Sequence, residues 1–145
     1  MKKLLLLSLL TLGYVTTTNA QELGIRFGDV TGGNVALDAL FSTSKSTVIH
    51  ADASFGRGGL GLDVLWDFLY RPLGDLPLKW YAGVGPSLFL GDDPSLAGMA
   101  ELGLSYRIVD IPLTVSADWR PTLILVETTD IYYGFFGLNV RYVFN

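Results

Sequence analysis

Hydrophobic and polar residues alternate along most of this chain with a period of two. The pattern is clearest over residues 131–144, which read IYYGFFGLNVRYVF. Because side chains of a β-strand point alternately to opposite faces, this stretch predicts a strand with one apolar and one polar face. Gly137, Asn139 and Arg141 lie on the polar face. The apolar face carries Tyr132, Gly134, Phe136, Leu138, Val140, Tyr142 and Phe144.

The same alternation occurs in earlier segments, and turn-forming sequences separate them. These segments are residues 22–28, 35–41, 49–55, 60–70, 78–88, 96–108 and 113–120. Together with the last stretch they predict an all-β fold, a closed antiparallel eight-stranded up-and-down transmembrane β-barrel. An even number of strands brings the two ends of the chain to the same side of the barrel.

Two prolines interrupt the pattern. Pro86 and Pro121 fall where a fully paired strand needs an N–H donor, so we expect a bulge or the end of the ladder near each. The apolar residues 122–126 would extend the seventh strand, with a tight turn at 127–130, but the sequence leaves this extension open.

The N-terminus has the organisation of an export signal. It begins with Met1, Lys2 and Lys3, continues with the apolar residues 4–12, and reaches small residues before Ala20. A charged start, a short apolar core and a small-residue exit are typical of a cleaved signal peptide. We therefore expect residues 1–20 to be removed and residues 21–145 to form one barrel domain. An N-terminal helix of the folded domain is the alternative, but an amphipathic pattern is missing.

Composition excludes several classes of function. The chain has no cysteine, which rules out disulfide scaffolds, thiol catalysis and cysteine metal sites. Without residues 1–20 it has 8 basic and 14 acidic residues, a net charge of −6, which argues against nucleic acid as a partner. Half of the residues are hydrophobic, although no later run is long enough for a transmembrane helix.

Alternation alone does not tell whether the apolar face points into a soluble barrel or out of a membrane barrel. In our strand register no charge falls on the apolar face, and glycines favour the polar face, which suits a narrow interior. Aromatic residues near strand ends are typical of the two membrane-interface girdles. These aromatics are Phe27, Phe41, Phe55, Phe68, Tyr70, Trp80, Tyr106, Tyr132, Tyr142 and Phe144. The alternative is a soluble lipocalin-like barrel that binds an apolar ligand.

The polar faces would then enclose a charged lumen. Its expected members are Glu22, Arg26, Asp38, His50, Asp52, Asp63, Asp67, Lys79, Glu101, Arg107, Asp118, Arg120 and Arg141. Charges of both signs in a narrow, poorly solvated space favour a paired network. We expect this network to plug the lumen; a proton- or ion-conducting path is the alternative.

Candidate chemistry is limited. His50, Asp52 and Ser54 share one strand face, so a lipid-modifying hydrolase similar to outer-membrane lipid A deacylases is an alternative. Neighbours on one face lie about 7 Å apart, too far for direct contact, so we expect no catalytic residues. One histidine and no cysteine argue against a zinc site, and we expect no cofactor.

Several predicted turns are rich in aspartate. These residues, Asp29, Asp92, Asp93 and Asp130, could bind calcium weakly. Aspartate is also favoured in ordinary turns, which is the interpretation we prefer.

The final strand, with the aromatic Phe144 before Asn145, resembles the terminal strand of bacterial outer-membrane β-barrels. With the N-terminal signal and the strand count, the chain resembles the small eight-stranded members of that porin-like group, which includes the OmpA transmembrane domain and OmpX-type proteins. The resemblance implies an outer-membrane location, contact with membrane lipid, and assembly by the barrel-assembly machinery through the C-terminal strand. It also implies a monomer with a structural or interaction role. Short outer turns argue against adhesion through protruding loops.

Overall fold

The computed structural model describes residues 20–125 and 130–144, and this part of the chain is all β. Its strands are β1 (Ala20–Val30), β2 (Gly33–Ser42), β3 (Val48–Gly56), β4 (Gly59–Pro72), β5 (Leu78–Leu90), β6 (Ser95–Arg107), β7 (Leu113–Trp119), β8 (Thr122–Ile124), β9 (Asp130–Tyr132) and β10 (Phe136–Val143). No helix among the described residues is long and apolar enough to cross a membrane. The predicted signal peptide lies outside these residues except for Ala20, the first residue of β1.

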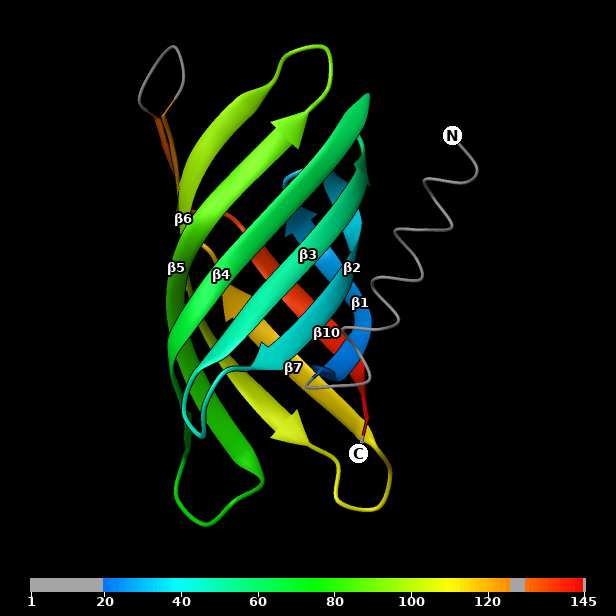
Figure 1. Cartoon of the computed structure of the whole chain (residues 1–145), viewed down its shortest axis with the longest axis vertical. Helices are drawn as coiled ribbons and strands as arrows, with labels where there is room; N and C mark the ends of the chain where they lie inside the picture. The colour runs from blue at the N-terminus through cyan, green and yellow to red at the C-terminus, as the bar shows by residue number, and fades with distance from the viewer. Residues whose placement is uncertain (1–19, 126–129, 145) are drawn as a thin grey trace.

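The sheet closes on itself as an eight-stranded antiparallel barrel, as predicted. Consecutive strands pair from β1 to β6, and β1 also pairs with β10, for example Gly24 with Arg141. Figure 1 shows the wall curving round until β1 and β10 lie side by side. Strands β7 and β8 form the seventh strand of the wall, and β9 and β10 form the eighth, because each pair is separated only by a local break.

The break near Pro121 confirms the predicted irregularity there. The ladder with β6 keeps one register across it, with Leu102 opposite Trp119 in β7 and Met99 opposite Thr122 in β8. On the other side Trp119 pairs with Phe136 and Thr122 pairs with Tyr132, so three residues face two and the eighth strand bulges. Strand β8 therefore extends the seventh strand as far as Ile124. Residues 126–129, with most of the predicted turn, lie outside the described part.

The structure confirms a local break in the ladder at Pro86, on one side of β5. Strand β5 runs through this residue, and the pairs Gly85–Met99, Pro86–Gly98 and Ser87–Ala97 follow one register. With β4, the ladder pairs stop at Asp63–Ser87 and resume at Trp66–Val84, so Pro86 lies in a gap of the ladder, as expected for a residue without an N–H donor.

A second bulge lies in β4, at a place where β4 itself has no proline or glycine, although Gly83 of β5 lies opposite. The pairing of β4 with β5 shifts by one residue between Trp66–Val84 and Leu69–Ala82. Since an extra residue reverses which later side chains face inward, this bulge turns Tyr70 into the lumen.

Candidate functional site

The centre of the barrel is polar and charged. Three of the largest fully buried side chains are Arg26, Arg120 and Arg141, each at most 1% exposed. They come from β1, from the break between β7 and β8, and from β10. Alternation explains their positions, because each lies on the polar face of its segment. Buried charges require paired, hydrogen-bonded partners, which the neighbouring strands provide.

Arg141 connects its own strand, β10, to three other strands. Its Nε donates to Glu22 Oε2 and its Nη1 to Asp38 Oδ2, both at 2.8 Å. Its Nη2 donates to Ser116 Oγ at 2.9 Å. The guanidinium thus joins β10 to carboxylates of β1 and β2 and to a hydroxyl of β7.

His50 and Arg120 extend the network across the lumen. His50 Nε2 lies 2.6 Å from Asp38 Oδ1, and its Nδ1 lies 2.8 Å from Glu101 Oε1. Arg120 donates to Glu101 Oε2 at 2.9 Å and to Asp52 Oδ2 at 2.5 Å. Asp38 therefore links the Arg141 and His50 groups, and Glu101 links His50 to Arg120.

Asp118 is the centre of a third group. It accepts from Arg26 Nη1 at 2.5 Å, from Tyr81 Oη at 3.0 Å and from Asn139 Nδ2 at 2.8 Å. Arg120 Nε lies 3.6 Å from Asp118 Oδ1, which brings this group next to the preceding one. Sequence reasoning did not select Tyr81 or Asn139 as site residues, although both occupy inward positions of the alternation.

Four predicted lumen residues lie apart from these hydrogen-bonded groups. Lys79 is exposed at the end of β5, with its amine 5.1 Å from the centre of the Tyr70 ring. Arg107 is half-buried, and no ion pair joins it to another described residue. Both line a depression at this end of the barrel, so the prediction that they belong to the buried network was wrong. Lys79 is the first inward residue of β5 and Arg107 the last of β6, so both lie at the barrel end, where water reaches them.

The other two residues are buried carboxylates. Asp63 Oδ1 accepts from Thr31 Oγ1 at 2.6 Å and from Ser87 Oγ at 2.5 Å, so hydroxyls and not cations hold it. Asp67 Oδ2 lies 3.9 Å from His50 Nδ1, and neither of its carboxylate oxygens accepts a hydrogen bond from the described residues.

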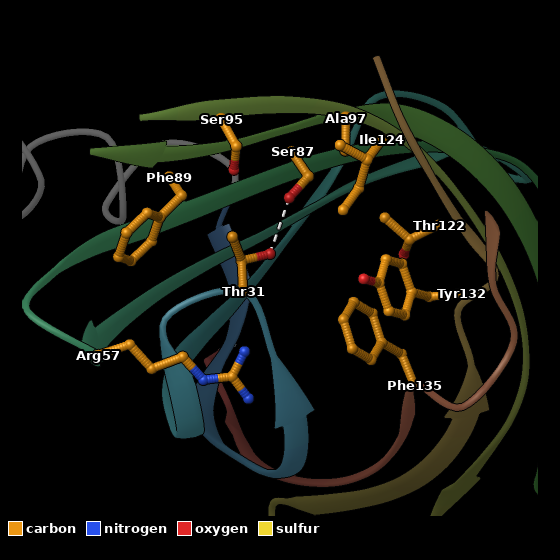
Figure 2. A pocket seen from close by; sticks show the side chains of 10 residues that line it. All are labelled: Thr31, Arg57, Ser87, Phe89, Ser95, Ala97, Thr122, Ile124, Tyr132 and Phe135. Atoms are coloured by element: carbon orange, nitrogen blue, oxygen red, sulfur yellow. Dashed lines mark hydrogen bonds between the residues drawn. The ribbon is translucent and has the colours of Figure 1, made fainter. Parts of the chain in front are cut away.

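Two of the predicted membrane-interface aromatics point inward instead. Tyr70 is 7% exposed, and its hydroxyl donates to Ser105 Oγ at 3.4 Å. Tyr132 lies opposite the buried Thr122 and lines a cavity at the mouth of the barrel (Figure 2). Each follows or adjoins a bulge, which reverses the inward and outward positions that strict alternation predicts.

The remaining predicted aromatics lie on outward positions of their strands. Most of them are exposed, and Phe41 and Trp80 are half-exposed. They are Phe27, Phe41, Phe55, Phe68, Trp80, Tyr106, Tyr142 and Phe144.

The hydrolase alternative finds no support in the contacts of His50. Both ring nitrogens are within hydrogen-bonding distance of carboxylates of other strands, Asp38 and Glu101, and not of Asp52. Ser54 Oγ accepts from the Gly32 amide at 2.8 Å and donates to the Gly61 carbonyl at 3.5 Å.

Two groups of side chains are close enough to offer ligands to a metal ion. They are Asp38 with His50 and Asp52, and His50 with Asp67 and Glu101. Arg120 Nη2 lies 3.3 Å from both ring nitrogens of His50, and its positive charge opposes a second cation at this place. Of the described residues, the turn aspartates Asp29, Asp92, Asp93 and Asp130 belong to no such group.

The arrangement defines a class of protein: a closed eight-stranded β-barrel with a buried charged network. No protein-family model matches the chain, and no curated protein does. Among solved structures the chain is similar to the solution NMR structure of the de novo designed TMB2.3, with a TM-score of 0.61 and 13% sequence identity. The match covers 88% of this chain and 95% of the designed one. At this identity the likeness shows the shared fold alone.

Proposed function

We propose that the protein is an integral β-barrel of the bacterial outer membrane, with a sealed lumen and a structural or interaction role. The observation that carries this proposal is the inverted distribution of side chains. Leu37, Leu102 and Leu138 are 55%, 51% and 57% exposed on the outer wall, whereas Arg26, Asp38 and Arg141 are 0% exposed inside. Apolar surface of this extent is costly in water and favourable in hydrocarbon.

The buried network also argues against the soluble alternative. A lipocalin-like carrier of an apolar ligand needs an apolar cavity at its centre. Here Arg120 and Glu101, with His50, occupy that place. The designed protein that the chain resembles, TMB2.3, is a transmembrane β-barrel, which agrees with a membrane location.

The same contacts support a plug and not a pore. A series of hydrogen-bonded pairs crosses the lumen, from β10 to β2, on to the neighbouring β3, and from β3 to β6. A barrel of eight strands has an interior just wide enough for side chains, so a paired network of this kind fills it. Solutes would have to break several buried ion pairs to pass.

The remaining parts of the proposal follow from the sequence. Residues 1–20 would direct export and be removed, and the strand ending at Phe144 would be the contact with the barrel-assembly machinery. The outer wall would contact membrane lipid, and the protein would act as a monomer without chemistry of its own.

A gel comparison of boiled and unboiled protein, residues 21–145 refolded in detergent micelles, tests the membrane barrel. We expect a heat-dependent mobility shift, with β-rich circular dichroism only when detergent is present. Folding in plain buffer without a mobility shift would contradict the proposal and favour the soluble carrier. Planar-bilayer recording tests the plug: we expect no steady conductance, and a constant open channel would refute a sealed lumen.

A further inference from the structure

The barrel has a cavity at the end that carries the β1–β2, β3–β4 and β5–β6 turns. Its volume is about 420 Å³, within the range of small-molecule sites. Residues of the β1–β2 and β3–β4 turns, of β5, β6 and β8, and of the eighth strand surround it, as Figure 2 shows. The cavity is distinct from the charged network, because none of the network's cations lines it.

Hydroxyl groups on one side of the cavity are held in place. Thr31 Oγ1 lies 2.7 Å from Ser87 Oγ, and both hydroxyls bond the buried Asp63. The β1–β2 turn is fixed here because the Gly32 amide donates to Ser54. A Cβ on Gly61 would lie 2.5 Å from the Gly32 nitrogen, so the turn fits closely against β4 only with glycine at position 61. On this side the cavity therefore has hydroxyl groups in fixed positions.

Aromatic rings form much of the remaining wall. The rings of Tyr132 and Phe135 are nearly parallel, with an interplanar angle of 8° and centroids 6.2 Å apart. Phe89 lies on the other side of the space in Figure 2. Flat rings on two sides favour a ligand with a flat aromatic body.

Arg57 is the cation that lines the cavity. Its backbone has φ of 51°, a left-handed conformation that a non-glycine residue rarely adopts. Within the described parts of the chain no hydrogen bond or ion pair engages its guanidinium, and no carboxylate is among the lining residues. Figure 2 shows the guanidinium directed into the space between the aromatic groups.

We propose that this cavity binds a small aromatic carboxylate. The ring of the ligand would lie against Tyr132 and Phe135, and its carboxylate would accept hydrogen bonds from Arg57. A guanidinium donates two parallel hydrogen bonds to a carboxylate. A hydroxyl or an ammonium group on the ligand could not accept this pair of hydrogen bonds. The site is independent of where the barrel resides, so its test does not depend on the proposed function.

The test is a titration of the folded, isotope-labelled protein in zwitterionic micelles with naphthalene-2-carboxylate, followed by amide NMR shifts. We expect saturable shifts at Arg57, Phe89 and Tyr132. The cation 2-naphthylmethylammonium has the same ring system and controls for partition into micelles; we expect no saturable shifts with it. Arg57→Gln should weaken binding about tenfold, which the lost charge-assisted hydrogen bonds predict.

Two matched variants complete the experiment. Arg71→Gln removes an exposed arginine at the opposite end of the barrel, and we expect unchanged binding. Ala97→Phe fills the cavity, since Ala97 is buried in its lining, and we expect saturable shifts to disappear in protein whose amide spectrum away from the cavity matches that of the wild type. Equal binding of anion and cation, unchanged binding by Arg57→Gln, or shifts that do not saturate would each overturn the proposal.

Discussion

Replacing Arg120 by methionine should destabilise the barrel mainly through the loss of its ion pairs, and not through a loss of packing volume. Arg120 is 1% exposed and donates to both Asp52 and Glu101. Methionine fills a similar space but leaves both carboxylates without this cation. Removing one partner from a buried ion pair costs about 3–5 kcal/mol. We therefore expect Arg120→Met to lower the free energy of unfolding by about this amount.

Reversible urea unfolding in lipid vesicles, monitored by tryptophan fluorescence, measures the change. The matched control is Arg71→Met, because Arg71 is exposed at the end of β4. An exposed arginine contributes at most about 1 kcal/mol through its charge, so this variant should unfold close to wild type.

A double variant separates the unpaired charge from the altered shape. Arg120→Met leaves Asp52 without its ion pair, whereas Glu101 keeps His50 at 2.8 Å. Asp52→Asn removes this unpaired charge and should restore about 1–2 kcal/mol in the Arg120→Met background. A loss below about 1 kcal/mol for Arg120→Met, or no recovery in the double variant, would refute the role of the network in stability.

Two further substitutions test the wall and the packing of the lumen. Gly137→Ala should lower the free energy of unfolding, because a Cβ there would lie 2.3 Å from the Arg26 guanidinium. In an Arg26→Ala background most of this loss should disappear. If the two substitutions instead lower the free energy of unfolding additively, the contact is contradicted. Leu102→Arg places a charge on the exposed outer wall. It should cost about 2–4 kcal/mol of folding free energy in vesicles if the site faces hydrocarbon, and a loss near zero would place it in water.

The sequence predicted the strand positions well, because the alternation of apolar and polar residues within a strand depends on that strand alone. Asn139 and Arg141 lie inward, as the polar face of the last stretch indicated. The two misplaced aromatics, Tyr70 and Tyr132, lie beside bulges. A bulge depends on the pairing of two strands, and the residues between Trp66 and Leu69 carry no local sign of one. Pro86 marked a break in the ladder correctly, because a missing N–H donor is a property of the residue itself and not of its partner strand.

The partners within the network were not predictable from the chain either. Alternation places Asp38, His50 and Glu101 on inward faces, but the stagger of the strands decides which of them meet. Asp38 and His50 lie on neighbouring strands and are not opposite in the ladder, where Asp38 faces Asp52 and His50 faces Leu40. The cavity was missed for a related reason, because it is built from turns and from a bulged segment whose course depends on barrel closure.

The bonds of Arg141 have a consequence for the order of folding. This residue lies 119 positions from Glu22 and 103 from Asp38 along the chain, so its ion pairs form only when the last strand meets the first two. An unclosed sheet would leave these charges unpaired in a poorly solvated environment, which is unfavourable. Closure therefore gains the stabilisation of these two ion pairs in a single late step, which disfavours the accumulation of unclosed barrels. The ion pairs of Arg141 stabilise only the closed barrel, whereas the Asp38–His50 pair joins the adjacent strands β2 and β3 and does not require closure.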